Sequence, residues 1–277
     1  AAHTTTAYGE AAPAFNVWAW WADTDPKDVA DMEEYLTSNV VTPYISKGEF
    51  VHRGSGSWGG STPYFWPTRG SLVFAGYSPS QTLGGTFDYD VKIGKFTAKD
   101  YVQSHYIDQT VDLMWFDRTK FHNTNDNVNG KGQTVNGVPV VFHHALSWLE
   151  FRVVRKADVP ANWLITELDL TGIETKADFN SDGTLQWTDQ EVPHDIRVWN
   201  GSYLAQSTYK VLESTPNGVI VIPQECAEGK ANLKVTFDYG ADNEYSTTEL
   251  FGYIIDSGDF GQTFQLGYVT STNGYKG

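Results

Sequence analysis

Residues 138–154, VPVVFHHALSWLEFRVV, lie at the midpoint of the chain and combine an apolar run with a regular alternation. Leu149, Phe151 and Val153 are apolar, and the two residues between them are charged. A period of two is typical of a β-strand with one solvated face. The same alternation recurs in GTFDYDVKIG and in NLKVTFDYG, with turn-forming segments between the runs. The pattern therefore predicts an all-β fold.

The length of the chain predicts two domains, because 277 residues exceed the usual size of a single core. The Asn/Gly-rich segment 122–137 lacks an apolar period, so the boundary is placed there, between domains 1–135 and 136–277. A content of 14% aromatic residues with 26 Gly suits short strands, so each domain is predicted to be a β-sandwich. The midpoint stretch is then the opening strand of the second sandwich.

Several shorter segments predict particular elements. Residues 15–22, FNVWAWWA, are apolar on both faces, which indicates a strand buried from both sides. Residues 24–36 carry Val29, Met32 and Leu36 at helical spacing, which predicts one short helix in the first domain. Asn200-Gly201, between IRVW and SYLA, predicts a two-residue hairpin turn of type I′.

Charge and cysteine usage exclude several classes of function. A net charge of −15 with 19 Lys+Arg disfavours nucleic acid and anionic membranes as partners, since both require basic patches. Cys226 is the only cysteine, so an intrachain disulfide is impossible. No run reaches the ~18 apolar residues of a membrane helix. The first ten residues lack the pattern of a signal peptide, so we expect a mature or trimmed chain.

The sequence carries no recognisable catalytic motif. It contains no G-x-S-x-G, no H-E-x-x-H, no phosphate-binding G-x-x-x-x-G-K-[ST] and no zinc-like Cys/His spacing. His143 and His144 have no further ligand at a metal-binding spacing, and Asp88 and Asp90 lie on the expected solvent face of one strand. We predict a protein that is not an enzyme and has no cofactor.

One segment matches a calcium-binding loop. In DFNSDGTLQWTD, oxygen donors at Asp178, Asn180 and Asp182 precede Gly183, and Asp189 takes the place of the usual bidentate Glu. The same residues also fit a hairpin turn between KADF and TLQW. Both interpretations stay open at this stage, with calcium the only metal that the sequence indicates.

An aromatic cluster within residues 48–67 allows a second function. Gly and Ser alternate there with Trp58, Tyr64, Phe65 and Trp66. Such rings can stack on sugars and form a glycan platform, or they can pack against a sheet beside the neighbouring prolines. A carbohydrate-binding surface module is therefore the alternative to a structural role.

The order of these segments resembles the fimbrillin family, the fimbrial and cell-surface subunits of Bacteroides-like bacteria. The resemblance covers residues 15–253, and its motifs occur in the following order: FNVWAW, TPYFWPTRGSLVFAGYSP, QTVDLMWF, VPVVFHHALSWLEFRVV, ITELDLTGI and VIVIPQ. It implies two tandem transthyretin-like Greek-key sandwiches and an exported lipoprotein precursor at the outer membrane or in the fimbrium.

The resemblance also implies how such a protein works. The partners are other fimbrial subunits joined by donor-strand exchange, with a host or bacterial surface ligand as a further partner, and no active site. Polymerising members are cleaved after an N-terminal arginine, for which Arg53 is the candidate, although it follows the first strand and helix. The chain ends at TSTNGYKG where members commonly have a long alternating strand, so an open groove in the second domain is a further expectation.

Overall fold

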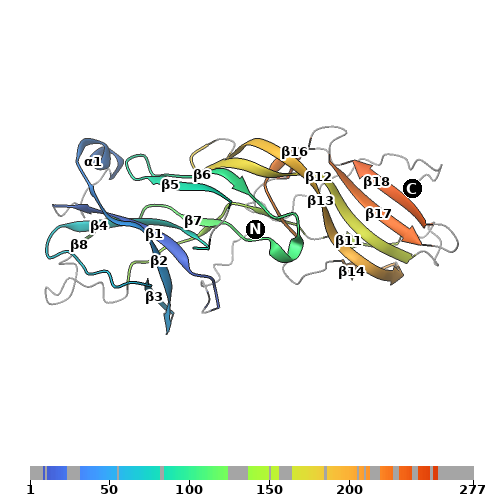
Figure 1. The fold of residues 1–277 in the computed structure, drawn as a ribbon, viewed down its shortest axis with the longest axis horizontal. Coiled ribbons are helices and arrows are strands. Elements are labelled where there is room, and N and C mark those ends of the chain that lie inside the picture. The colour runs from blue at the N-terminus through green and yellow to red at the C-terminus, as the bar shows by residue number, and fades with distance from the viewer. Residues whose placement is uncertain are drawn as a thin grey trace.

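Strands make up most of the structure, which confirms the all-β prediction (Figure 1). The described part of this computed structural model contains one α-helix, α1 (Met32–Ser38), and one short 3-10 helix, η1 (Ile107–Gln109). The residues described are 9, 11–23, 32–54, 56–81, 84–123, 137–149, 151–155, 164–183, 186–204, 206–208, 210–212, 219–226, 231–238, 243–249 and 252–254.

The strands form two large antiparallel sheets and three short pairs. The first sheet has seven strands in the order β3-β2-β1-β4-β7-β9, with β8 also paired to β4. These strands are β1 (Phe15–Ala22), β2 (Thr42–Gly54), β3 (Ser57–Gly60), β4 (Ser71–Ser78), β7 (Met114–Phe116), β8 (His122–Asn123) and β9 (His143–His144).

The second sheet has six strands in the order β18-β17-β12-β6-β5, with β13 also paired to β12. They are β5 (Gly84–Asp90), β6 (Lys95–Val102), β12 (Leu164–Asn180), β13 (Trp187–Leu204), β17 (Asn232–Asp238) and β18 (Asn243–Glu249). The short pairs are β10 (Ser147–Leu149) with β15 (Val219–Val221), β11 (Arg152–Val153) with β14 (Lys210–Val211), and β16 (Gln224–Cys226) with β19 (Gly252–Ile254).

The two large sheets face each other across an aromatic N-terminal core. Trp18 and Tyr77 of the first sheet pack against Phe87, Phe96 and Phe179 of the second. The rings of Tyr77 and Phe87 stack with centroids 4.8 Å apart. Burial of several such rings stabilises the fold by about 1.5–3 kcal/mol per side chain. The N-terminal core therefore lies between two sheets whose strands are distant in sequence.

Strand β1 is buried on both faces, as its sequence predicts. Its even residues, such as Trp18 and Trp20, enter the N-terminal core. Its odd residues, such as Phe15 and Val17, enter a separate outer core on the opposite face of the first sheet. Residues 138–142 cover this outer core with the side chains of Val138, Val140 and Phe142. The apolar character of FNVWAWWA follows from this double burial, and its one polar residue, Asn16, is buried with its side-chain amide donating to the carbonyl of Ser80 at 3.4 Å.

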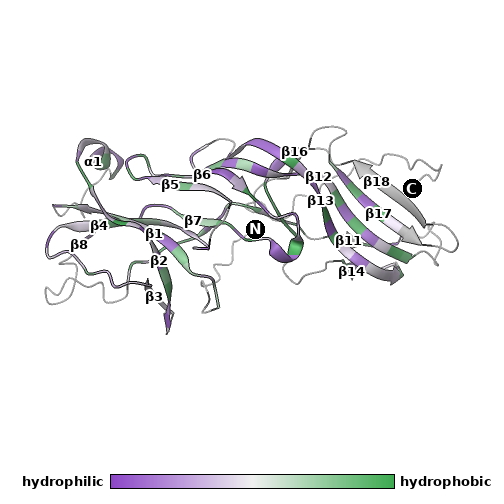
Figure 2. Cartoon of the chain, in the orientation of Figure 1, coloured by the Kyte–Doolittle hydropathy of each residue, from purple (hydrophilic) through white to green (hydrophobic). Residues whose placement is uncertain are grey.

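The 17-residue strand β12 runs from the right-hand part of the molecule toward its middle (Figure 1). Strand β13 pairs along one side of it. On the other side, β17 pairs with residues 164–171 and β6 with residues 176–180. The first part of β12 lines a C-terminal core with Ile165, Leu168 and Leu170, and its last part enters the N-terminal core. Apolar and polar residues alternate visibly along β12 and β13 (Figure 2).

The prediction of one continuous strand in the midpoint stretch is wrong. The stretch contains β9, β10 and β11, which pair with β7, β15 and β14 respectively. Ala145 and Leu146 point into the N-terminal core, whereas Leu149 and Phe151 pack against the C-terminal core. The apolar run is long because its successive parts pack against three cores: the outer core, the N-terminal core and the C-terminal core.

Strand pairing crosses the position of the predicted domain boundary. β9 and β12 follow residue 135, yet they pair with β7 and β6, which precede it. Residues 124–136 lie outside the described part of the chain. The division at residues 135 and 136 and the transthyretin-like strand order stay predictions.

The predicted hairpin turn at Asn200-Gly201 is wrong. Both residues lie within β13, and Asn200 pairs with Glu167 of β12. The register shifts between Ile165 and Glu167, which places an extra residue in β13 at this point. A Cβ on Gly201 would lie 2.7 Å from Cζ2 of Trp199. The glycine therefore serves a bulge with a close side-chain approach rather than a turn.

The helix and the strand at GTFDYDVKIG agree with the sequence over part of their length. Leu36 of α1 is fully buried in the N-terminal core, as the helical spacing predicts, whereas residues 24–31 lie outside the described chain. Strand β5 ends at Asp90, so the last residues of the alternating segment GTFDYDVKIG do not belong to the strand. Residues 91–94 form a turn in which the N–H of Gly94 donates to the carbonyl of Asp90.

Candidate functional site

The 61–70 loop joins β3 to β4 and carries three of the four predicted platform residues. Two of the four pack inward. The ring of Trp58, in β3, lies 5.3 Å from the ring of Phe15, and that of Trp66 lies 5.9 Å from Phe74. Both tryptophans are partly buried against the outer core. Trp58 and Trp66 therefore pack against the sheet, which is the alternative to sugar stacking that the sequence left open.

The other two predicted platform residues reach the surface. Phe65 is 78% exposed and Tyr64 is 41% exposed. Tyr64 lies nearly parallel to Phe50 of β2, with ring centroids 6.0 Å apart. The structure thus separates the four residues into an inner pair and an outer pair.

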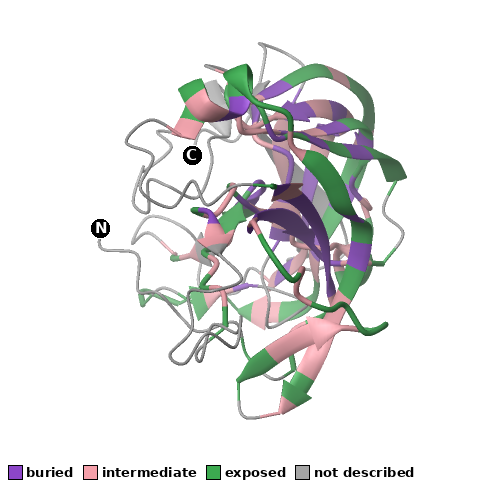
Figure 3. Ribbon diagram, turned by 90° about the vertical axis from the view of Figure 1, so that its left-hand side faces the viewer, coloured by how far each residue is buried: buried purple, intermediate pink, exposed green. Residues whose placement is uncertain are grey.

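Two glycines allow Tyr64 to lie on the β2–β3 hairpin. A Cβ on Gly48 would stand 2.4 Å from the Tyr64 hydroxyl oxygen, and a Cβ on Gly60 would stand 2.5 Å from a ring carbon. Real Cβ atoms do not approach so closely, so the ring needs glycine at both positions. The hairpin is the lowest element in Figure 3, where its residues are mostly intermediate or exposed.

A third exposed aromatic residue, Tyr44, joins this pair and was missed by sequence reasoning. Ala19 pairs with Ile45 and Trp20 with Pro43, so Tyr44 is the extra residue of a β-bulge. Its hydroxyl donates to the carbonyl oxygen of Phe65 at 2.5 Å. A bulge changes the direction of the side chains beside it, so the alternation of the sequence does not predict where the Tyr44 side chain points. Tyr44, Tyr64 and Phe65 are called the aromatic patch below.

Arg53, the predicted processing site, lies in β2 with its side chain across β3. Its guanidinium donates to the carbonyls of Gly60 and, at 3.4 Å, Ser61. The arginine covers part of the edge strand of the first sheet. Cleavage after Arg53 stays a prediction, and it would require the β2–β3 hairpin to open.

The residues of the predicted calcium loop lie on a β-hairpin. Asp178 and Asn180 belong to β12 and Asp189 to β13, whose residues Phe179 and Trp187 pair directly. The Asp178 carboxylate accepts the N–H of Asp100 at 2.7 Å. The Asn180 side chain accepts the N–H of Asp182, as in an ordinary turn. The hairpin interpretation is confirmed, whereas calcium binding stays a prediction.

Other polar candidates lie apart from one another. The Asp88 carboxylate accepts the N–H of Tyr89 within β5, and the Asp90 carboxylate accepts the N–H of Lys92 in the turn that follows. Nδ1 of His144 lies 2.7 Å from Asp112, at the surface. Within the described ranges, no three His, Cys, Asp or Glu side chains gather closely enough to hold a metal ion.

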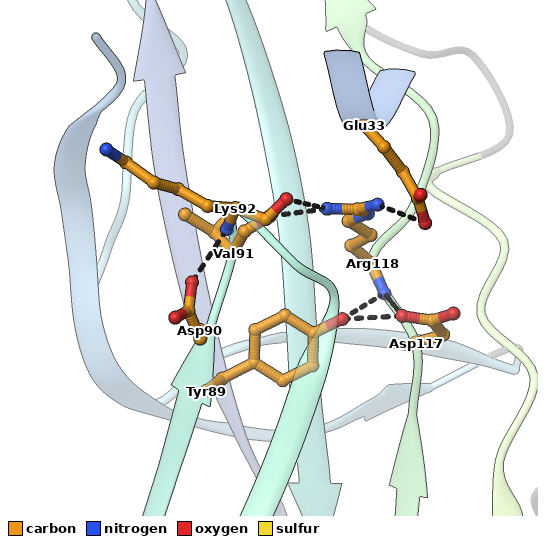
Figure 4. Close-up of polar contacts among 7 residues, drawn as sticks. All are labelled: Glu33, Tyr89, Asp90, Val91, Lys92, Asp117 and Arg118. Atoms are coloured by element: carbon orange, nitrogen blue, oxygen red, sulfur yellow. Dashed lines mark hydrogen bonds and ion pairs between the residues drawn. The ribbon is translucent and has the colours of Figure 1, made fainter. Parts of the chain in front are cut away.

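A polar cluster surrounds Arg118 (Figure 4). Its side chain is 7% exposed, and its guanidinium donates to the carbonyls of Val91 at 2.6 Å and Lys92 at 3.0 Å. A third contact, 3.1 Å long, reaches the carboxylate of Glu33 in α1. Arg118 therefore connects the segment after β7, the β5–β6 turn and the helix.

Tyr89 completes this cluster and fixes its chemical character. Its hydroxyl donates to Asp117 at 2.5 Å and accepts the N–H of Arg118 at 2.9 Å. Burial, reinforced by the Asp117 carboxylate, raises the pKa of Tyr89 far above its ordinary value. The hydroxyl stays protonated at neutral pH and acts as a hydrogen-bond donor, not as a base. The arrangement fits a structural clamp.

We expect Arg118→Met to lower the free energy of unfolding by about 2–3 kcal/mol, because the carbonyls of Val91 and Lys92 lose a buried charged donor. Urea denaturation measures the change. Arg69→Met is the matched control, since Arg69 pairs with Asp23 at the exposed surface and its loss should cost about 0.5 kcal/mol or less. Equal losses in both variants would contradict the clamp.

Comparison with known proteins assigns the chain to a family. The sequence model of a family described as fimbrillin-like matches residues 3–265. The chain belongs to the fimbrillin-like family. The resemblance predicted from the order of its segments is thereby confirmed. No curated protein sequence matches the chain.

Two solved structures resemble this fimbrillin-like chain at low sequence identity. One, from Bacteroides uniformis, is 16% identical with a TM-score of 0.46 and covers 88% of this chain and 80% of its own. The other, from Bacteroides ovatus, is 13% identical with a TM-score of 0.47 and covers 89% and 80%. The names of both suggest a role in cell adhesion.

Membership in the fimbrillin-like family supports a fimbrial or adhesive role. None of the helices in the described residues is long and apolar enough to cross a bilayer.

Proposed function

We propose that this chain is a non-enzymatic fimbrial subunit or fimbria-associated adhesin at the bacterial cell surface. In this proposal it is exported as a lipoprotein precursor, reaches the outer membrane, and joins other fimbrial subunits by donor-strand exchange. The family match over residues 3–265 is the main support. Strand exchange uses main-chain pairing for affinity and apolar side chains for register.

The C-terminal core carries the observation that favours strand exchange. Opposite β12, β13 and β17, the described layer consists of the pairs β10–β15 and β11–β14, which are two or three residues long. Leu233 and Val235 of β17 contact this core but are only partly buried. A donated strand with alternating apolar residues would extend the short layer and cover such side chains.

A peptide that mimics a donated strand is expected to stabilise the purified chain. The peptide has about 12 residues, long enough to follow a strand, with Val or Ile alternating with Thr or Lys. At a concentration about 100 times its Kd it should add about 2.7 kcal/mol, which raises Tm by about 5–10 °C. Differential scanning calorimetry measures the shift.

A scrambled peptide of the same composition is the control, because it retains the hydrophobicity and charge but not the alternation. Hydrogen exchange should show new protection in the short strands β10, β11, β14 and β15, whose layer the peptide would extend, only with the alternating peptide. An equal effect of both peptides, or none from either, would count against strand exchange at the C-terminal core.

A further inference from the structure

We propose that the aromatic patch, Tyr44, Tyr64 and Phe65, is a binding site for neutral saccharides. The inference deepens the adhesive role proposed above and rests on it. It differs from the four-residue platform predicted from sequence, because Trp58 and Trp66 pack inward and Tyr44 takes part. The ligand class follows from three properties of the patch.

The first property is that the patch is exposed, while the Tyr64 ring and the backbone that carries Phe65 are held in place. Phe65 is 78% exposed, but its carbonyl accepts a hydrogen bond from Tyr44. Tyr64 rests against Gly48 and Gly60 and stacks beside Phe50. The loop itself is anchored by the N–H of Ser61, which donates to the carbonyl of Glu49 at 2.7 Å. A ligand would therefore meet a positioned Tyr64 ring and an anchored loop backbone, which reduces the entropic cost of binding.

The second property is the electrostatic character of the surroundings. The neighbouring charged groups already have partners, since Arg53 donates to backbone carbonyls and Glu49 accepts the hydroxyl of Ser80 at 2.8 Å. Nothing in this arrangement selects a charged ligand. The net charge of −15 also opposes binding of an acidic surface. A neutral sugar has an apolar C–H face that can stack on the rings. It needs no charged partner on the protein, and the negative net charge does not repel it.

The third property is size. Three rings that are 39–78% exposed offer about 300 Å² of aromatic surface. A stable protein partner needs about 800 Å² on each side. The patch is thus sized for one or two sugar rings rather than for a folded domain.

A glycan array with the fluorescently labelled full chain tests the proposal. We expect wild type to retain neutral hexose- or N-acetylhexosamine-terminated glycans. Phe65→Ala and Tyr64→Ala should each weaken the strongest of these interactions by about tenfold, as measured by isothermal titration with that glycan. Tyr106→Ala is the matched control, since Tyr106 is 58% exposed but lies outside the patch, and it should bind like wild type.

Three outcomes would overturn the proposal: no glycan retained by wild type, equal binding by wild type and Phe65→Ala, or equal loss in Tyr106→Ala. Thermal unfolding of each variant confirms that the fold is intact. The alternating-peptide experiment, repeated with Phe65→Ala, separates this inference from strand exchange. A Tm rise retained by Phe65→Ala together with its loss of glycan binding would show that the two sites are separate, whereas wild type that shows the Tm rise but retains no glycan would reject the saccharide site and leave the subunit role in place.

Discussion

A fragment that ends at residue 135 is expected to remain unfolded, although the sequence places a domain boundary there. The fragment lacks β9 and the last part of β12, which pair with β7 and β6. It also lacks Phe179 and Trp187, two large aromatic residues of the N-terminal core. Loss of these rings and of the adjoining strands removes more than the about 5–15 kcal/mol by which a typical protein is stable.

Circular dichroism and the spread of amide signals in NMR spectra measure the folding of the fragment. The full chain is the positive control. Mixing the fragment with residues 136–277 is the complementary arm, because the missing strands return with the second piece. A fragment that unfolds cooperatively on its own would contradict this prediction and support the boundary placed from sequence.

Local patterns predicted the strands but not their partners. Double burial of β1 follows directly from the apolar residues on both its faces, and Leu36 follows from helical spacing. A period of two, however, does not say which sheet a strand joins. The midpoint stretch therefore looked like one strand, while its successive parts pair with β7, β15 and β14. The hairpin turn predicted at Asn200-Gly201 was wrong because glycine occurs in bulges as well as in turns.

Prediction of the candidate sites was limited in the same way, because local patterns do not reveal tertiary contacts. Phe65 and Tyr64 were predicted from composition, and both are exposed. Tyr44 was missed because a bulge, which is set by pairing with β1, turns it toward the 61–70 loop. Arg118 was missed because its partners Val91 and Glu33 are 27 and 85 residues away in sequence. Contacts of this kind depend on tertiary structure and leave no periodic signal.

Trp187→Ala is expected to lower the free energy of unfolding of the whole chain by about 3–5 kcal/mol. Trp187 is 6% exposed, its ring lies 4.9 Å from Phe179 and 5.5 Å from Tyr101, and its indole N–H donates to the carbonyl of Ala145 at 2.7 Å. Trp187→Phe keeps a ring in this position but loses the hydrogen bond, so a smaller loss of about 1–2 kcal/mol is expected. Trp148→Ala, at a tryptophan that is 41% exposed, should cost about 1 kcal/mol or less.

The form of the transition distinguishes coupled from independent halves. Trp187 lies after the predicted boundary but packs in the N-terminal core, and β12 and β13 continue from that core into the C-terminal one. Trp187→Ala should therefore shift a single urea transition, with circular dichroism and tryptophan fluorescence changing together. If the two signals separate, with the C-terminal core unchanged, the long strands do not couple the cores energetically. Coincident shifts would mean that the chain unfolds as one cooperative unit, because β12 belongs to both cores.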